Sequence, residues 1–190
     1  MNDRYTFISL ISQKTDLATW LVFDEVTHQT CIAKSASAKS RLHLHQLKTE
    51  IQILSRLKGQ NFCTLLDVIS QKEQLILIEQ KIAGITLDDW LKTKPDRRKR
   101  RQIFSQIVRL IQKVHEAGYV YMDLKADNIL ISQNKAWLID FNSCIPCGSS
   151  QVLMANPHSL PPEYGQRKPI TEKADQIGLG RLYRKMLGSG

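Results

Sequence analysis

The middle of the chain carries charged and amide side chains at spacings that suit phosphoryl transfer. The segment YMDLKADN contains Asp123, Lys125 and Asn128, and the segment WLIDF ends the next apolar run with Asp140. Phosphoryl transfer needs cations on the phosphates, a carboxylate near the acceptor hydroxyl, and hard oxygen ligands for Mg²⁺. These residues supply all three kinds of group.

In order and spacing, the two segments resemble the catalytic loop and the metal-binding DFG segment of eukaryotic-type (Hanks-type) Ser/Thr protein kinases. The resemblance implies that Asp123 is the catalytic base, that Lys125 steadies the transferred phosphate, and that Asn128 and Asp140 bind Mg²⁺. Either motif alone is more often a surface turn or a strand end. Both together favour the kinase interpretation.

The N-terminal half resembles the same family independently. Lys34 in CIAK matches the strand lysine that holds the α- and β-phosphates of ATP, and Glu50, sixteen residues later, matches the helix carboxylate that orients it. Taken alone, such residues are usually surface charges. Their position upstream of the catalytic loop favours a catalytic ion pair.

The segment LILIEQKIAG is similar to the family's last N-terminal strand and its hinge. The resemblance implies that Ile78 lies at the back of the adenine pocket and that backbone groups of Glu79 and Lys81 bond the adenine edge. Ile32 stands where the family carries a small alanine over the adenine.

Hydrophobic periodicity predicts the elements that must position these residues. Strand-like runs and a hairpin precede one amphipathic helix, and the pattern becomes helical after Gly84. Expected strands are 19–26, 30–36, 63–70 and 74–80, and expected helices are 41–58, 86–92, one opening at Asp96, and 173–186.

The predicted fold is therefore α+β and two-lobed, like a protein kinase. One kinase-like domain is expected over 1–190, with an N-lobe of antiparallel strands and one helix at about 1–78, a hinge at 79–81, and a shortened helical C-lobe at 82–187. The C-lobe is expected to end after a helix whose Asp175 anchors the catalytic loop. A ligand cleft is expected between the lobes.

The sequence departs from the family pattern in several places. The positions of the glycine-rich loop hold Gln13, Thr15 and Ala18, so the phosphate clamp is expected to be weaker, with Lys14 as a compensating cation. Tyr121-Met122 replaces the usual His-Arg, which removes the receptor for an activation-loop phosphate.

Other departures concern packing and the end of the domain. Asn142 replaces the DFG glycine, a mild change because Asn tolerates positive φ. Tyr121 is expected to fill an apolar spine beside Phe141, Leu54 and Leu66. The segment NPHSLPPE resembles the end of the activation segment, and its Glu163 lacks the arginine from later helices. A partner chain or a second copy is expected to cover the shortened lobe.

Composition and charge further limit the class of protein. The 190 residues carry 42% apolar residues and a net charge of +9. No apolar run reaches the ~20 residues of a membrane span, and no signal-peptide pattern opens the chain, so a soluble cytoplasmic protein is expected. The run Arg97–Arg101 suits nucleic acid, an anionic membrane or an acidic protein, or a solvated helix turn. Cys144-x-x-Cys147 is a weak zinc or redox signal.

These patterns predict a protein Ser/Thr kinase that uses ATP and Mg²⁺ and acts on itself or another protein. The alternative is a nucleotide-binding pseudokinase that acts as a scaffold or regulator, favoured by the missing glycines. A small-molecule kinase is disfavoured by Lys125 and the PPE segment. A nucleic-acid-binding module built on the basic run is a further alternative.

Overall fold

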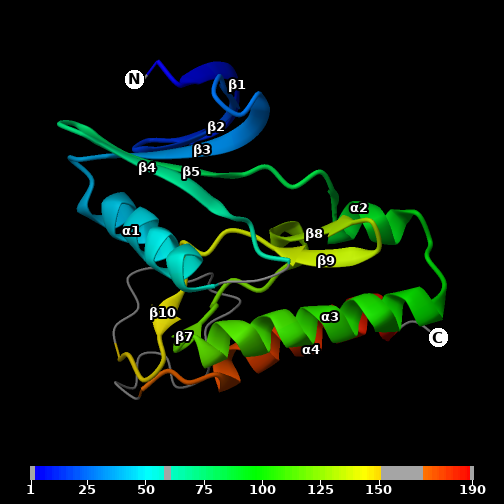
Figure 1. Ribbon diagram of the computed structural model, residues 1–190. Coiled ribbons are helices and arrows are strands. Elements are labelled where there is room, and N and C mark those ends of the chain that lie inside the picture. The colour runs from blue at the N-terminus through cyan, green and yellow to red at the C-terminus, as the bar shows by residue number, and fades with distance from the viewer. Residues whose placement is uncertain (1–2, 58–60, 151–168, 189–190) are drawn as a thin grey trace. The chain divides into compact units, whose positions relative to one another are not determined.

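The computed structural model describes residues 3–57, 61–150 and 169–188. The chain divides into two compact units (Figure 1). Unit 1 comprises Met1–Ser55 and Cys63–Lys81, and unit 2 comprises Arg56–Phe62 and Ile82–Gly190. Each unit is described by itself.

Unit 1 contains one five-stranded antiparallel sheet in the order β1-β2-β3-β5-β4. Alternating side chains divide it into two faces. One face carries a core of Tyr5, Val22, Cys31, Ala33, Ile76 and Ile78, with Trp20 and Ile69 packed against it. Its strands are β1 (Tyr5–Lys14), β2 (Leu17–Asp24), β3 (Gln29–Ser37), β4 (Leu65–Gln71) and β5 (Gln74–Gln80).

The single helix of unit 1, α1, spans Arg41–Arg56 and follows β3. The hydroxyl of Ser40, just before the helix, accepts a hydrogen bond from the backbone N–H of His43, as an N-cap residue does. Leu47, Ile53 and Leu54 are among the buried residues of α1. Glu50 is also buried, which places a carboxylate on the apolar face of this helix.

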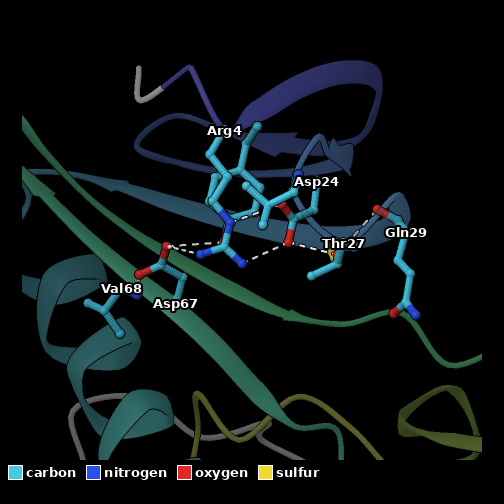
Figure 2. A network of polar contacts seen from close by, with 9 residues as sticks. Arg4, Asp24, Thr27, Gln29, Asp67 and Val68 are labelled. Carbon is cyan, nitrogen blue, oxygen red and sulfur yellow. Dashed lines mark hydrogen bonds and ion pairs between the residues drawn. The ribbon is translucent and has the colours of Figure 1, made fainter.

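An ion-pair network joins the first residues of unit 1 to its sheet (Figure 2). The guanidinium of Arg4 donates from Nε and Nη2 to the two carboxylate oxygens of Asp24 at 2.9 and 2.8 Å, and its Nη1 lies 3.7 Å from Asp67 Oδ2. Thr27 donates its hydroxyl to Asp24 as well. The Arg4 hydrogen bond is the main reason why the pKa of Asp24 lies well below its usual range.

Unit 2 is built around the long helix α3 (Arg97–Glu116). Asp96 caps it by accepting from the Lys99 N–H at 2.8 Å, as the sequence predicted. Gly118, just beyond its end, has a φ of +87°, the left-handed conformation that favours glycine at helix ends. The buried stripe consists of Ile103, Ile107, Leu110, Ile111 and Val114.

The described residues of unit 2 also form two shorter α-helices and two small sheets. Helix α4 (Lys173–Leu187) packs along α3 (Figure 1), and α2 (Leu87–Lys92) begins after its cap Thr86. One sheet pairs β7 (Tyr119–Val120) with β10 (Ile145–Pro146). The other has the order β6-β8-β9, formed by Ile85–Thr86, Ile129–Ser132 and Lys135–Leu138.

The predicted α+β architecture is confirmed. An antiparallel sheet with one helix precedes a part rich in helices, and the predicted helix at 41–58 is found at 41–56. The sequence did not predict the short strands β7 and β10. Their two residues each are too few to show any alternation of apolar and polar side chains. Within the described residues, no helix combines the length and apolar character needed to cross a membrane.

Candidate active site

In unit 1, Lys34 and Glu50 form the ion pair that the sequence predicted. Lys34 lies on β3 and Glu50 on the third turn of α1. Lys34 Nζ donates a hydrogen bond to Glu50 Oε1 at 2.6 Å. The Lys34 side chain is only 13% exposed and that of Glu50 1%. Water is largely excluded from this pair, so its electrostatic interaction is stronger than that of a surface pair.

A second carboxylate, Glu79, also contacts the lysine. Glu79 Oε1 lies 3.2 Å from Lys34 Nζ, and its Oε2 accepts a hydrogen bond from the Cys63 thiol at 3.4 Å. Burial is the main cause of a pKa for Cys63 well above its usual value, and the nearby Glu79 charge adds to it. The thiol is therefore a protonated donor to this carboxylate.

Strand register explains why Glu79 reaches Lys34 and Ile78 does not. In an antiparallel ladder, directly paired residues project from the same face, and neighbours along a strand alternate. Lys34 pairs with Leu77, and Ile32 pairs with Glu79, so these four side chains share one face. Ile78 pairs with Ala33 and packs into the core on the opposite face.

The sequence-based assignment of this segment was therefore wrong by one residue. Glu79, not Ile78, occupies the end of β5 on the Lys34 face. The backbone of Glu79 lies between two strands, since it pairs with Ile32 on one side and Leu65 on the other. It is part of the sheet rather than of an open hinge. Lys81 follows the end of β5 and is exposed.

The turn between β1 and β2 takes the place of a glycine-rich loop. Gln13 pairs with Ala18 and Lys14 pairs with Leu17, which leaves Thr15 at the tip. Leu17 pairs in turn with Ala36, two residues beyond Lys34, so Lys14 shares the Lys34 face by register. Lys14 also lines a cavity of about 510 Å³ beside this turn. The same cavity is lined by Ser35 and Ser37, whose side chains alternate with that of Lys34 and so project from the other face of β3. The role of Lys14 as a compensating cation therefore stays a prediction.

In unit 2, one loop brings together Asp123, Lys125 and Asn128. Lys125 Nζ donates to Asp123 Oδ2 at 2.7 Å, and Asn128 Nδ2 donates to the same oxygen at 3.0 Å and to the Asp123 carbonyl at 2.9 Å. The 3₁₀ turn η1 (Ala126–Asn128) makes these short-range contacts possible. Asp123 is buried, whereas the Lys125 side chain is 42% exposed.

Asn128 and Asp140 come from adjacent segments of unit 2. The N–H of Ile139, the residue before Asp140, donates to the Asn128 carbonyl at 3.0 Å. Because Asn128 directs its Nδ2 toward Asp123, its Oδ1 is turned away from that carboxylate. An amide oxygen and a carboxylate are the hard ligands that Mg²⁺ prefers, so the donor set fits this ion.

The catalytic loop has a strained backbone that Asp175 holds in place. Met122 has a φ of +70° although it is neither glycine nor asparagine, a conformation that persists only where surrounding contacts enforce it. The Asp175 carboxylate, 1% exposed, accepts from the backbone N–H of Tyr121 at 2.8 Å and of Met122 at 2.9 Å. His115 Nε2 lies 2.7 Å from the same carboxylate. The predicted anchoring role of Asp175 is confirmed.

An aromatic stack supports the loop and the Asp140 segment. The ring of Phe141 lies 5.6 Å from that of Tyr121 and 6.0 Å from that of Phe62, between ring centroids. The Tyr121 hydroxyl also donates to the Ile139 carbonyl. The predicted pairing of Tyr121 with Phe141 is therefore confirmed. Leu66, however, is 42% exposed and does not belong to a core, whereas Phe62 does.

Three residues of these groups are not predicted by the sequence. The family resemblance concerns only the backbone of Glu79, Cys63 falls within the expected strand 63–70, and His115 belongs to no motif. The sequence does carry an indication for Glu79. An acidic residue at the end of an otherwise apolar strand needs a partner when it is buried. No sequence pattern indicates a role for His115, which follows only from its contact with Asp175.

Two sequence features are not explained by this site. The segment that contains Glu163 lies outside the described residues. Cys144 is buried and Cys147 is exposed, and no group of three potential metal ligands among His, Cys, Asp and Glu occurs within the described residues.

Comparison with known proteins agrees with these local geometries. The family described as "Protein kinase domain" matches residues 20–189. Maternal embryonic leucine zipper kinase of Xenopus laevis is 33% identical over 155 residues, which is 76% of this chain and 24% of that protein. The same kinase of Danio rerio is 32% identical over 153 residues, or 76% of this chain and 23% of that protein.

A third relative is mitogen-activated protein kinase mpkC of Aspergillus terreus, 32% identical over 117 residues, with 59% of this chain and 31% of that protein covered. The chain thus spans about a quarter to a third of the length of these relatives. The family match begins after the β1–β2 turn and includes every residue of the Lys34, Asp123 and Asp140 groups. This chain belongs to the protein kinase domain family.

Proposed function

We propose that this protein is an ATP-dependent Ser/Thr protein kinase that transfers the γ-phosphate to a hydroxyl group, including hydroxyls of its own chain. The observation that carries the proposal is the Asp123 group of unit 2. Within one short loop, Lys125 and Asn128 each donate a hydrogen bond to the buried Asp123 carboxylate, and Asn128 also donates to the Asp123 backbone carbonyl. Such a carboxylate is preorganised to accept a proton from a hydroxyl.

The remaining residues supply binding and charge. Lys34 contacts the α- and β-phosphates while Glu50 orients it, and Lys125 neutralises charge on the transferred phosphate. Asn128 and Asp140 would hold Mg²⁺, which neutralises the phosphates when it is bound. The names of the relatives, a leucine zipper kinase and a mitogen-activated protein kinase, support a protein substrate.

Adenine recognition is proposed for the backbone that follows Glu79. The strand β5 ends at Gln80, and Lys81, just beyond it, pairs with no strand in the described structure. Its backbone N–H and C=O are the donor and acceptor proposed for the adenine edge. Ile32, on the Lys34 face of β3, supplies apolar surface for the base.

A second candidate function, a nucleotide-binding pseudokinase, is favoured by one observation. The β1–β2 turn holds side chains where the family has glycines, which hinders close approach of phosphates to backbone N–H groups. Weaker contacts to the phosphates permit nucleotide binding without efficient phosphate transfer.

Transfer of labelled phosphate from Mg-ATP to the protein itself and to a generic basic protein tests the proposal. Wild type should label both, and Asp123→Asn should reduce transfer by about 10²- to 10⁴-fold because the proton acceptor is lost. Asp127→Asn, in the same loop but exposed, is the matched control and should retain activity.

Thermal unfolding with and without Mg-ATP separates the two candidate functions. Suppose that Mg-ATP stabilises wild type but not Asp140→Asn, and that wild type transfers no phosphate. This result would establish the pseudokinase and reject the kinase. Transfer that survives Asp123→Asn undiminished would reject the catalytic assignment.

A further inference from the structure

The lysine that would contact ATP already faces two carboxylates. Lys34 Nζ lies 2.6 Å from Glu50 Oε1 and 3.2 Å from Glu79 Oε1. The Glu79 side chain is 6% exposed, nearly as buried as that of Glu50. Glu79 thus places a second negative charge beside the Lys34 ammonium. A lysine and a single glutamate, the pair that kinases use, would be neutral.

Two observations indicate that Glu79 is built into this arrangement rather than placed there by chance. Its strand register fixes it on the Lys34 face, opposite Ile32. The Cys63 thiol donates to Glu79 Oε2 and has a pKa well above its usual value, so it stays a neutral donor. The Cys63 thiol on one oxygen and the Lys34 ammonium on the other thus fix the position of the Glu79 carboxylate.

We infer that Glu79 sets nucleotide affinity by competing with the phosphates for Lys34; this inference rests on the proposed function. The Lys34 ammonium donates to Glu50 and forms an ion pair with Glu79, so both carboxylates hold it before any ligand binds. Incoming phosphates share the ammonium with Glu79 and lie near a negative charge that a lysine–glutamate pair lacks. In a partly buried site with an effective dielectric constant of about 20, neighbouring like charges repel strongly enough to weaken binding roughly tenfold.

The inference predicts a dependence on ligand charge that packing alone would not produce. Neutralising Glu79 should strengthen binding most for the ligand with the most phosphate charge. The affinity for Mg-ATP should rise more than the affinity for Mg-ADP. The affinity for adenosine, which has no phosphate, should not change. A change in pocket shape would instead affect all three ligands alike, because all three contain the same base and sugar.

Titration calorimetry of the full chain with Mg-ATP, Mg-ADP and adenosine tests the inference. Glu79→Gln should lower the Kd of Mg-ATP about tenfold and leave that of adenosine unchanged. Glu79→Asp keeps the charge and should retain the wild-type affinity within about threefold. Glu25→Gln removes the same charge from an exposed turn of the same unit and serves as the matched control, with no change expected.

Several outcomes would overturn the inference. Equal gains for adenosine and Mg-ATP would show an effect of shape, and equal gains in Glu25→Gln would show an effect of total charge. Unchanged binding in Glu79→Gln, with wild type binding Mg-ATP, would reject the inference and leave the proposed function standing.

The proposed function itself fails if folded wild type and every variant bind no nucleotide. Binding by Glu79→Gln alone would support both proposals. If Glu79→Gln does not fold, Glu79→Met carries the test, because it also removes the charge at similar length and should show the same preference for Mg-ATP.

Discussion

The two lysine–carboxylate groups of this kinase domain are built in different ways. In unit 1, Lys34 meets Glu50 and Glu79, which lie on a helix and on another strand, and all three side chains are largely buried. In unit 2, Lys125, Asp123 and Asn128 come from one loop, and Lys125 is 42% exposed. The first group is a product of tertiary packing, whereas the second is assembled locally and then held from behind by Asp175.

Replacing the lysine of each group should reveal the largest difference in stability between the two groups. Lys34→Met leaves two buried carboxylates without their ammonium and should lower the free energy of unfolding by about 3–5 kcal/mol. Lys125→Met removes a half-exposed partner and should lower it by less than about 1 kcal/mol. Urea denaturation of both variants measures the difference. Similar losses in the two variants would contradict the contrast in burial.

Asp175→Asn tests whether the unit 2 group depends on its anchor. The neutral amide keeps only one acceptor oxygen, so one of the backbone N–H groups of Tyr121 and Met122 loses its acceptor and the other loses the charge on its acceptor. We expect a loss of about 2–3 kcal/mol in the free energy of unfolding, because buried donors are costly to leave unpaired. Phosphate transfer should fall with it, while Asp127→Asn in the exposed part of the loop should change neither.

Two glycines of α4 probe the packing behind the same loop. A Cβ at Gly178 would lie 2.8 Å from Leu124 Cβ, next to Asp123, whereas a Cβ at Gly180 would meet nothing within 4 Å. Gly178→Ala should destabilise the protein by about 1–3 kcal/mol through overpacking. Gly180→Ala should stabilise it by up to about 1 kcal/mol through helix propensity. Thermal unfolding of the two variants should therefore shift in opposite directions.

The smallest expected effect concerns a more exposed ion pair of unit 1. Because Arg4 lowers the pKa of Asp24, this pair contributes stability above the unfolded-state pKa of Asp, about 4, and loses it as the pH falls toward the lower folded-state pKa. The Tm of Arg4→Met should thus be lower than that of wild type at pH 7. The difference should shrink below about pH 4. A difference independent of pH would show that Arg4 acts through packing, not charge.

The sequence by itself determined the parts of this protein that lie close together along the chain. Asp123, Lys125 and Asn128 are within six residues of one another, so a local turn suffices to join them. The amphipathic helices were predictable for a similar reason: a period of 3.6 residues over many turns is a strong local signal.

Only the tertiary structure decided which face of β5 meets Lys34. A shift of one residue in a strand moves every side chain to the other face, and the sequence near Ile78 and Glu79 fits either choice by hydrophobicity. The pairing of β5 with β3 fixes that choice, and it depends on residues more than forty positions apart. For this reason the sequence showed a lysine with one glutamate, and the fold showed a lysine with two.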